Sequence, residues 1–339
     1  MILAFVLVLG LLPAAAFAID ANNVYISISD EGQFISSTMA HRAVSLDTLA
    51  AVDLNEYGLS DYLYDADGDG TYEITALHLY IYTHETILGL DWSEVTVTGS
   101  PASIYFAGGL FGFEDENLRY NYNGAYPADE NGWGFTADRI VLSAGDYFDV
   151  AHFSDWMFYM DSAYGFHYFV DGNDSITHAY TAEAGNELSV KLVRVGGGMG
   201  GTDTIESISD YTVYYGQTIG NATDSVTTGA DGAASITFPS AGTYYVWCKG
   251  DYGVDMASGI VSSPASAAVT VTAKEEEPAL EESRTPQSVS SVLNATMTQL
   301  AATVIEPVFG TTAGEWTVQA HRLYRECSRG CDGYRCDCQ

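Results

Sequence analysis

Basic residues are scarce in this sequence. Among 339 residues, 12 Lys and Arg stand against 45 Asp and Glu, which leaves a formal net charge of −33. The field of such a chain repels phosphate backbones and anionic lipid, so we expect no nucleic-acid partner. The charge suits an extracellular surface protein, or else it is only a solvated acidic surface. The length predicts two or three domains, each able to bury its own core.

Long apolar runs are also scarce. The stretch from Ile2 to Leu12 is followed by Ala16-Phe17-Ala18, the small-x-small pattern that signal peptidase recognises. We therefore predict that residues 1–18 are a signal peptide, although no Lys or Arg opens it, which leaves open whether Met1 is the true start. No other apolar run approaches 18 residues, which predicts a secreted or cell-surface protein without an integral membrane span after cleavage.

Catalytic signatures are missing. The sequence contains no HExxH and no Gly-x-Ser-x-Gly, and the glycine run at 196–201 lacks the Lys-Ser/Thr ending of a phosphate loop. His78 and His84 lie six residues apart on a predicted helix, so they point in different directions and cannot share a metal. The sequence therefore predicts that the protein is not an enzyme.

Cysteine is almost confined to the C-terminus. Four of the five cysteines and four arginines lie in residues 319–339, whereas the chain up to Val318 has eight basic residues and one cysteine. This shift indicates translation in a wrong reading frame. The alternative is a zinc site, although the CxxxC and CxC spacings are unusual for zinc folds and exported proteins more often oxidise their cysteines. Cys248, in an alternating strand, is expected to be a buried, inert thiol.

The remaining sequence predicts a mainly β protein with some α, of the α+β class. Residues 19–183 combine both kinds of element: residues 24–30 alternate apolar and polar side chains, as in a strand with one buried face. Residues 45–54 predict a short helix capped by Ser45, and residues 74–87 predict a second one.

From residue 187 onward the pattern changes. Residues 187–273 contain short strands at the spacing of a β-sandwich, and residues 274–287 form an acidic, proline-containing linker. In residues 288–318 apolar side chains recur at helical spacing, which predicts an amphipathic helix that needs partner helices.

Three segments of the first domain resemble the transcobalamin C-terminal-like domain: VSLDTLAAVDL, NLRYNYNGAYPADENGWG and IVLSAGDYFDV. In that β-grasp-like family a Tyr-x-x-Asn-Gly turn and a Gly-Asp before the last strand recur, and five residues here match, namely Tyr120, Asn123, Gly124, Gly145 and Asp146. The insertion at residues 61–85 departs from the compact carrier domain of the family. The resemblance implies capture of a cobalamin-like ligand.

Two further segments resemble known modules. Residues 187–273 resemble a bacterial immunoglobulin-like domain through TTGADGAASITFPSAGTYYVWCKG, although Val246 stands where antibody domains place a Tyr two residues before the second Cys. MTQLAATVIEPVFGTTAGEWTV resembles the start of a prenyltransferase-like α/α toroid. These three modules occur together in surface proteins of Gram-positive bacteria, and the resemblance implies that residues 288–318 are a truncated toroid.

DADGDGTYE is the strongest chemical signal. Asp65, Asp67 and Asp69 with the following glycine copy the first half of a calcium loop, and Glu73 stands at position nine. Position twelve, which should hold a carboxylate, is Ala76. The sequence therefore predicts either a calcium site or an acidic turn before the second helix, where the helix dipole favours negative charge.

A second candidate site is aromatic. Tyr120, Tyr122, Asn123, Tyr126 and Trp133 lie in a segment rich in Asn and Gly, a composition that favours stacking on sugars or flat ligands. The alternative is that these rings fill the core of the domain.

Together these patterns predict an exported, non-catalytic binding or adhesion protein of a bacterium. Its first domain would recognise an extracellular ligand, glycan or protein, and the immunoglobulin-like domain would be a spacer. The alternative is capture of a cobalamin-like ligand, whose site would need the missing toroid; we therefore expect no tight cobalamin binding.

Overall fold

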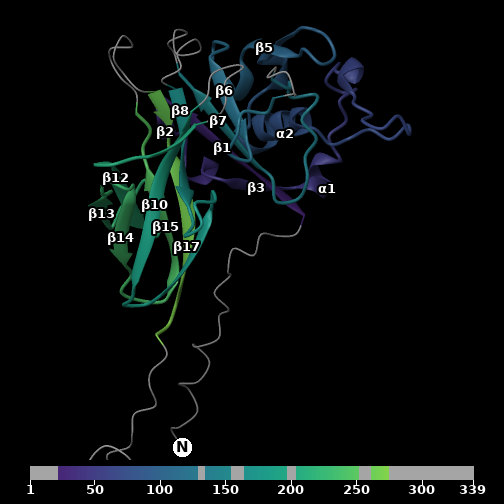
Figure 1. Ribbon diagram of the computed structural model, residues 1–339. Coiled ribbons are helices and arrows are strands. Elements are labelled where there is room, and N and C mark those ends of the chain that lie inside the picture. The colour runs from purple at the N-terminus through teal and green to yellow at the C-terminus, as the bar shows by residue number, and fades with distance from the viewer. Residues whose placement is uncertain (1–21, 129–133, 154–163, 197–203, 252–260, 275–339) are drawn as a thin grey trace, which may run out of the picture. The chain divides into compact units, whose positions relative to one another are not determined.

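The computed structural model describes residues 22–128, 134–153, 164–196, 204–251 and 261–274 (Figure 1). Most of these residues fall into two parts: an N-terminal module, residues 22–153, and a β-sandwich, residues 164–272, both within one compact unit that ends at Lys274. Several predicted features lie outside the described residues: the signal peptide, Trp133, the glycine run except Gly196, the linker after Lys274, the toroid-like segment and the cysteine-rich tail.

A mixed sheet forms the centre of the N-terminal module. Its two middle strands, β1 (Asn23–Asp30) and β7 (Tyr147–His152), run parallel although more than a hundred residues separate them. Strands β2 (Gln33–Phe34) and β3 (Arg42–Ser45) pair with β1, and β6 (Leu118–Tyr122) pairs with β7.

Both predicted helices are present. Helix α1 (Leu46–Leu49) is shorter than predicted, and the Ser45 side chain accepts a hydrogen bond from the Asp47 amide, as expected of its N-cap. Helix α2 (Ala76–Tyr82) continues into a π-helical turn, η3 (Thr83–Ile87). The prediction of a helix over 74–87 is therefore confirmed, and nearly all of α2 is buried.

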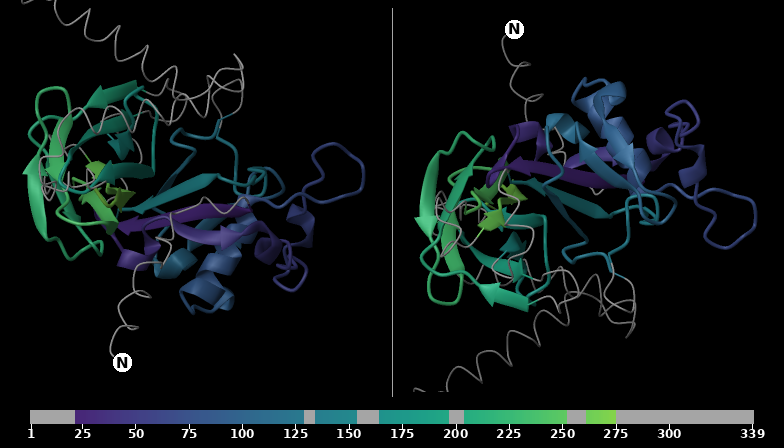
Figure 2. Two further views of the ribbon diagram at one scale, coloured as in Figure 1. Left: turned by 90° about the horizontal axis from the view of Figure 1, so that it is seen from below. Right: turned by 90° about the horizontal axis from the view of Figure 1, so that it is seen from above.

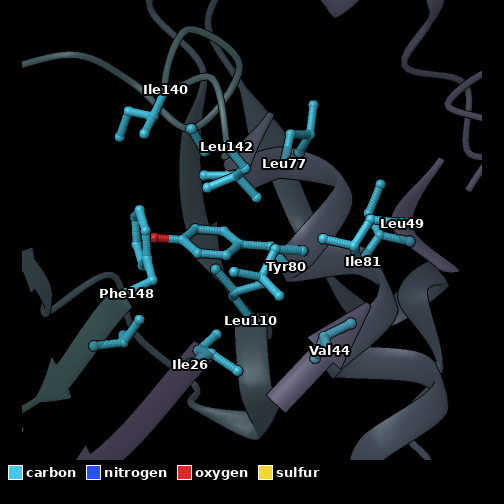
Figure 3. Close-up of a cluster of buried hydrophobic side chains, with 14 of the residues drawn as sticks. Ile26, Val44, Leu49, Leu77, Tyr80, Ile81, Leu110, Ile140, Leu142 and Phe148 are labelled. Atoms are coloured by element: carbon cyan, nitrogen blue, oxygen red, sulfur yellow. The ribbon is translucent and has the colours of Figure 1, made fainter. Parts of the chain in front are cut away.

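Helix α2 packs on one face of the sheet. Buried apolar side chains of the helix and the sheet form a cluster with Tyr80 at its centre (Figure 3). The Tyr80 ring lies edge-on to Phe148 of β7, at 5.4 Å between centroids. Ile26 of β1 and Leu110 complete the surroundings, and each is at most 1% exposed. The apolar alternation of β1 therefore forms the core, as the sequence predicts.

Short elements connect the sheet and the helices. They are η1 (Ser37–Met39), η2 (Ser60–Tyr62), η4 (Trp92–Glu94), η5 (Leu110–Gly112) and the hairpin β4 (Thr96–Thr98) with β5 (Tyr105–Gly108). No helix in the described part of the chain is long and apolar enough to span a bilayer.

The sandwich consists of two sheets that share one core. The first has the order β11-β10-β8-β16, with β14 also on β10, and the second has the order β13-β12-β15-β17-β9. Side chains from both sheets form a single apolar cluster. The strand bounds are β8 (Tyr164–Val170), β9 (Ala179–Glu183), β10 (Glu187–Gly196), β11 (Thr204–Ser207), β12 (Thr212–Gly216), β13 (Asp224–Thr227), β14 (Ala233–Thr237), β15 (Gly242–Cys248), β16 (Val261–Ser263) and β17 (Ala265–Thr272).

This sandwich is immunoglobulin-like. The adjacent strands β12, β15 and β17 have the order of strands C, F and G in that fold, and β10 and β14 occupy the places of B and E in the opposite sheet. The fold also has its tyrosine corner, because the Tyr244 hydroxyl on β15 donates to the Ser240 carbonyl at 3.2 Å. Tyr244, Val246 and Cys248 all face the core, so the corner Tyr stands two residues earlier than in antibody domains.

The sandwich begins earlier in the chain than residue 187. Strand β8 pairs with β10, and β9 pairs in parallel with β17, although both lie within the range 19–183 that the sequence assigns to the first domain. The pairing of β9 with β17 joins Ala179 to Ala268, which are far apart in the chain, so no local spacing predicts it.

The second face of β1 is buried, not exposed. The prediction of one buried face is wrong here, because Tyr25, Ser27 and Ser29 are only 6%, 5% and 2% exposed. Figure 2 shows the strands of the sandwich, teal to green, beside the N-terminal strands, purple. A small apolar cluster of Ala151 and Phe153 with Phe166 and other sandwich residues links the two parts.

Candidate functional site

The predicted aromatic site is largely built into the N-terminal module. Tyr120 and Tyr122 pack against the main core, and their hydroxyls donate to the carbonyls of Phe135, at 2.8 Å, and Val141, at 3.1 Å. Tyr120 also stacks on Phe148. These two rings therefore act as core residues in this structure, the alternative that the sequence leaves open.

Asn123 has a structural role at the turn after β6. Its φ of 52° is in the left-handed region, which Asn tolerates better than most residues. The side chain donates to Asp146 at 2.8 Å and accepts from the Tyr147 amide at 2.9 Å. Tyr122 also donates to Asp146. Asp146 thus ties the Asn-Gly turn to the start of β7. Tyr126 lies within 6.4 Å of Tyr120, ring centre to ring centre.

The aspartates of the predicted calcium loop converge. Carboxylate oxygens of Asp65, Asp67 and Asp69 lie within 4.8 Å of one another, and Glu73 is not part of the group. The carboxylates accept hydrogen bonds from backbone amides of the same loop, including that of Gly68 at 2.7 Å and that of Gly70 at 2.9 Å. The loop is exposed and organised by its own backbone, so the calcium site stays a prediction.

A different site, which the sequence does not predict, lies where the N-terminal module meets the sandwich. A cleft of about 440 Å³ opens there, within the usual range of small-molecule pockets. The module contributes β1, β3, β7 and η1, and the sandwich contributes β9, β15, β17 and the turn after β12. Its lining residues are Tyr25, Ser37, Thr38, Ala40, His41, Arg42, Ala43, Tyr147, His178, Ala179, Gln217, Thr218, Ile219, Tyr245, Ser266 and Ala268.

Four rings form one wall of this cleft. Tyr25 stacks on Tyr147 at 4.7 Å between centroids, and Tyr147 stacks on His178 at 3.7 Å. His41 meets His178 at 4.2 Å in an edge-on arrangement. The rings come from four segments of the chain, so their stacking fixes the module against the sandwich.

Asp149 contacts His41, one of the four rings of this wall. The carboxylate is buried and accepts hydrogen bonds from Ser27 and, at 3.0 Å, from Tyr168 of the sandwich. His41 Nε2 lies 3.4 Å from the same carboxylate, and His41 Nδ1 lies 3.2 Å from Ser266 Oγ on β17. His41 therefore bridges a strand of the module and a strand of the sandwich.

The protonation of this cluster follows from its surroundings. Burial alone would raise the pKa of Asp149, but hydrogen bonds and charge from His41, with further help from His178 and Ser27, lower it, so the carboxylate is ionised. Burial lowers the pKa of His178 well below its ordinary value, and the charge of His41 adds to this effect. Burial also raises the pKa of Tyr147 to about 12. At neutral pH, His178 and Tyr147 are both uncharged.

The cleft lacks carboxylates, which is unusual for so acidic a chain. Among the described residues that line it there is no Asp or Glu, and its one residue with a full charge is Arg42. The site cannot be predicted from the sequence because its residues have no characteristic spacing. The one available signal is that Tyr25 lies on the strand face that was predicted to be exposed.

Comparison with known proteins adds little to this geometry. No protein-family model and no curated protein matches the chain. The solved ectodomain of the teleost fish polymeric Ig receptor is 9% identical over 40% of this chain and 57% of its own, with a TM-score of 0.18. The N-terminal four Ig domains of Dscam1 isoform 9.44 are 10% identical over 54% of this chain and 41% of theirs, with a TM-score of 0.16. The immunoglobulin-like assignment therefore rests on the strand order of the sandwich itself.

Proposed function

We propose that this protein is a secreted or cell-surface binding protein that holds a small extracellular ligand in the cleft between its N-terminal module and its sandwich. The observation that carries the proposal is the cleft of about 440 Å³, walled by stacked rings and edged by a few polar groups. Binding pockets combine an apolar or aromatic lining with a few placed polar groups in this way. The bacterial origin that the resemblances imply is part of the same proposal.

The sandwich has more than a spacer role in this proposal. Tyr245, Ser266 and Ala268 on β15 and β17 supply part of the lining, and His178 supplies part of the ring wall. A β-grasp-like recognition module is supported by the parallel central strands β1 and β7 with helix α2 across them. Ligand recognition would therefore need both parts together.

A thermal-shift screen tests the proposal. The full chain is heated with a panel of neutral sugars, acidic sugars and aromatic acids, alongside two variants of β9. Ala179→Phe would fill the cleft, whereas Thr181→Phe changes an exposed residue of the same strand that does not line it. We expect at least one compound to raise the Tm of the wild type and of Thr181→Phe but not of Ala179→Phe. No shift with any compound, or a shift that survives Ala179→Phe, would contradict the proposal.

Capture of a cobalamin-like ligand is less well supported. The toroid-like residues 288–318, which such a site would need, lie outside the described residues. The cleft volume is near the small end of the pocket range of about 300–1,000 Å³. This size suits one or two rings and not a corrin macrocycle.

One observation favours a second candidate function, acyl transfer. His41 lies between the Asp149 carboxylate and the Ser266 hydroxyl, at 3.4 Å and 3.2 Å. In hydrolases such an Asp orients the His, which takes the proton of the Ser. However, Ser266 is 3% exposed and lies in the regular strand β17, not on a turn that would present a nucleophile, so ligand binding ranks first.

A fluorophosphonate probe decides between these functions. Attack by Ser266 would form an oxygen–phosphorus bond as fluoride leaves, and His41 would accept the hydroxyl proton. Labelling of the wild type that is lost in Ser266→Ala and in His41→Gln would establish catalysis. An unlabelled protein would eliminate it.

A further inference from the structure

We propose that the cleft selects a small cyclic carboxylate, of the acidic-sugar class, with Arg42 as the residue that binds its carboxylate. This inference rests on the proposed binding function and specifies its ligand. The cleft differs in charge from the rest of this molecule, because its described lining has no Asp or Glu whereas the chain has a net charge of −33.

Arg42 is the cation of the cleft. It lies on β3, its side chain is exposed, and no carboxylate in the described part of the chain forms an ion pair with it. Two other arginines behave differently: Arg139 pairs with Asp138, and Arg194 pairs with Glu206. A guanidinium presents a planar fork of donors that matches a carboxylate in bidentate geometry. Arg42 is therefore available for a ligand carboxylate at the edge of the cleft.

Other charged groups near the cleft do not cancel Arg42. The Asp149 carboxylate is buried, with its oxygens engaged by Ser27, Tyr168 and His41. The uncharged His178 and three Tyr side chains complete the titratable groups that line the cleft with His41. Arg42 is therefore the charged group that a ligand entering the described part of the cleft would meet. In a chain of net charge −33, this is a place where an anion meets little repulsion.

The neutral lining fits a ring that carries hydroxyl groups. Ser37, Thr38, Gln217 and Thr218 offer hydroxyl and amide groups that can both donate and accept hydrogen bonds. Tyr245, on the sandwich side, adds an aromatic surface of the kind that packs against the apolar face of a sugar ring. A sugar acid combines the required features: one carboxylate, several hydroxyls and a compact ring.

Titration calorimetry at physiological salt tests the inference, with glucuronate, glucose and glucose 6-phosphate as probes. We expect glucuronate to bind the wild type at least tenfold more tightly than glucose does. Arg42→Gln should remove this preference, and Arg42→Lys should retain part of it, because the charge stays but the fork is lost. Lys249→Gln, which removes an exposed charge outside the cleft, should bind like the wild type.

Three results would overturn the inference: equal affinity for glucose and glucuronate, unchanged glucuronate affinity in Arg42→Gln, or binding of glucose 6-phosphate with no binding of glucuronate. Each can be told apart from failure of the proposed function. If a neutral or phosphorylated compound binds and Ala179→Phe blocks it, the cleft is a binding site and only the carboxylate assignment fails. If no compound binds at all, the proposed function fails as well.

Discussion

Two groups of carboxylates in this molecule differ in how they are built. Asp65, Asp67 and Asp69 lie within five residues of one another, and the backbone of the same loop satisfies them. Asp149, in contrast, is held by groups from three other segments: Ser27, His41 and Tyr168. The first group is visible as a spacing in the sequence, whereas the second exists only after the module and the sandwich meet. The comparison predicts that the fold depends more on the buried carboxylate than on the exposed ones.

The largest expected difference between the two groups is in stability. Asp149→Asn places an amide among donors that require an acceptor, so we expect a loss of about 3 kcal/mol in the free energy of unfolding. Asp65→Asn, in the exposed loop, should cost less than about 0.5 kcal/mol. Urea unfolding of both variants measures the difference. Similar midpoints for the two would show that the buried cluster does not stabilise the contact between the parts.

The pH dependence of stability should also distinguish the buried residues from the exposed aspartate loop. His178 and His167 have lowered pKa values, the latter about 3, because loss of hydration disfavours the charged ring and positive neighbours add to this effect. In the unfolded chain the two His side chains have a pKa of about 6.5 and take up protons below this pH, whereas in the folded chain they do not. Stability should therefore fall as the pH drops below about 6.5, by about 1.4 kcal/mol per pH unit for each His.

The variant His178→Asn isolates one of these protons. Its stability at neutral pH will be lower because the stacking on Tyr147 is lost, but the informative quantity is the slope between pH 6 and 5. We expect this slope to decrease by about 1.4 kcal/mol per pH unit, whereas Asp65→Asn should leave it unchanged. An unchanged slope in His178→Asn would mean that this residue is protonated in the folded state.

A matched pair of glycines tests the contact between the parts. Gly32 and Gly58 both have positive φ, 74° and 70°, so Ala is strained at either position. An added Cβ at Gly32 would lie 2.9 Å from backbone atoms of Gly250 on the sandwich side, while at Gly58 nothing lies within 4 Å. We expect Gly58→Ala to cost about 1 kcal/mol and Gly32→Ala about 1–2 kcal/mol more. Equal melting temperatures would contradict the close approach of the two backbones.

The smallest expected effect is that of calcium on the aspartate loop. With a Kd of about 1 mM, as in weak extracellular sites, 1 mM calcium would stabilise the protein by about 0.4 kcal/mol. Calorimetry should detect this binding in the wild type and in Gly32→Ala but not in Asp67→Asn. No heat at millimolar calcium would leave the loop as an acidic turn before helix α2.

Local elements were largely predictable from the sequence. The Ser45 cap and helix α2 follow from local spacing, and the strands of the sandwich follow from alternation and turn residues. The aromatic segment was open to two interpretations, since a Tyr that packs in a core and a Tyr that stacks on a ligand have the same sequence pattern. The structure places Tyr120 and Tyr122 against the core because β6 presents them to β7 and α2.

The sequence by itself determined the charge, the strand-rich composition, the two helices and the aspartate loop, because each depends on residues that are neighbours in the chain. Only the tertiary structure decided that β8 and β9 belong to the sandwich, that the second face of β1 is buried, and that His41, Tyr147, His178 and Ser266 meet at one cleft. The physical reason is that pairing and packing between distant segments depend on complementary surfaces. Such surfaces leave no period or spacing in a single sequence.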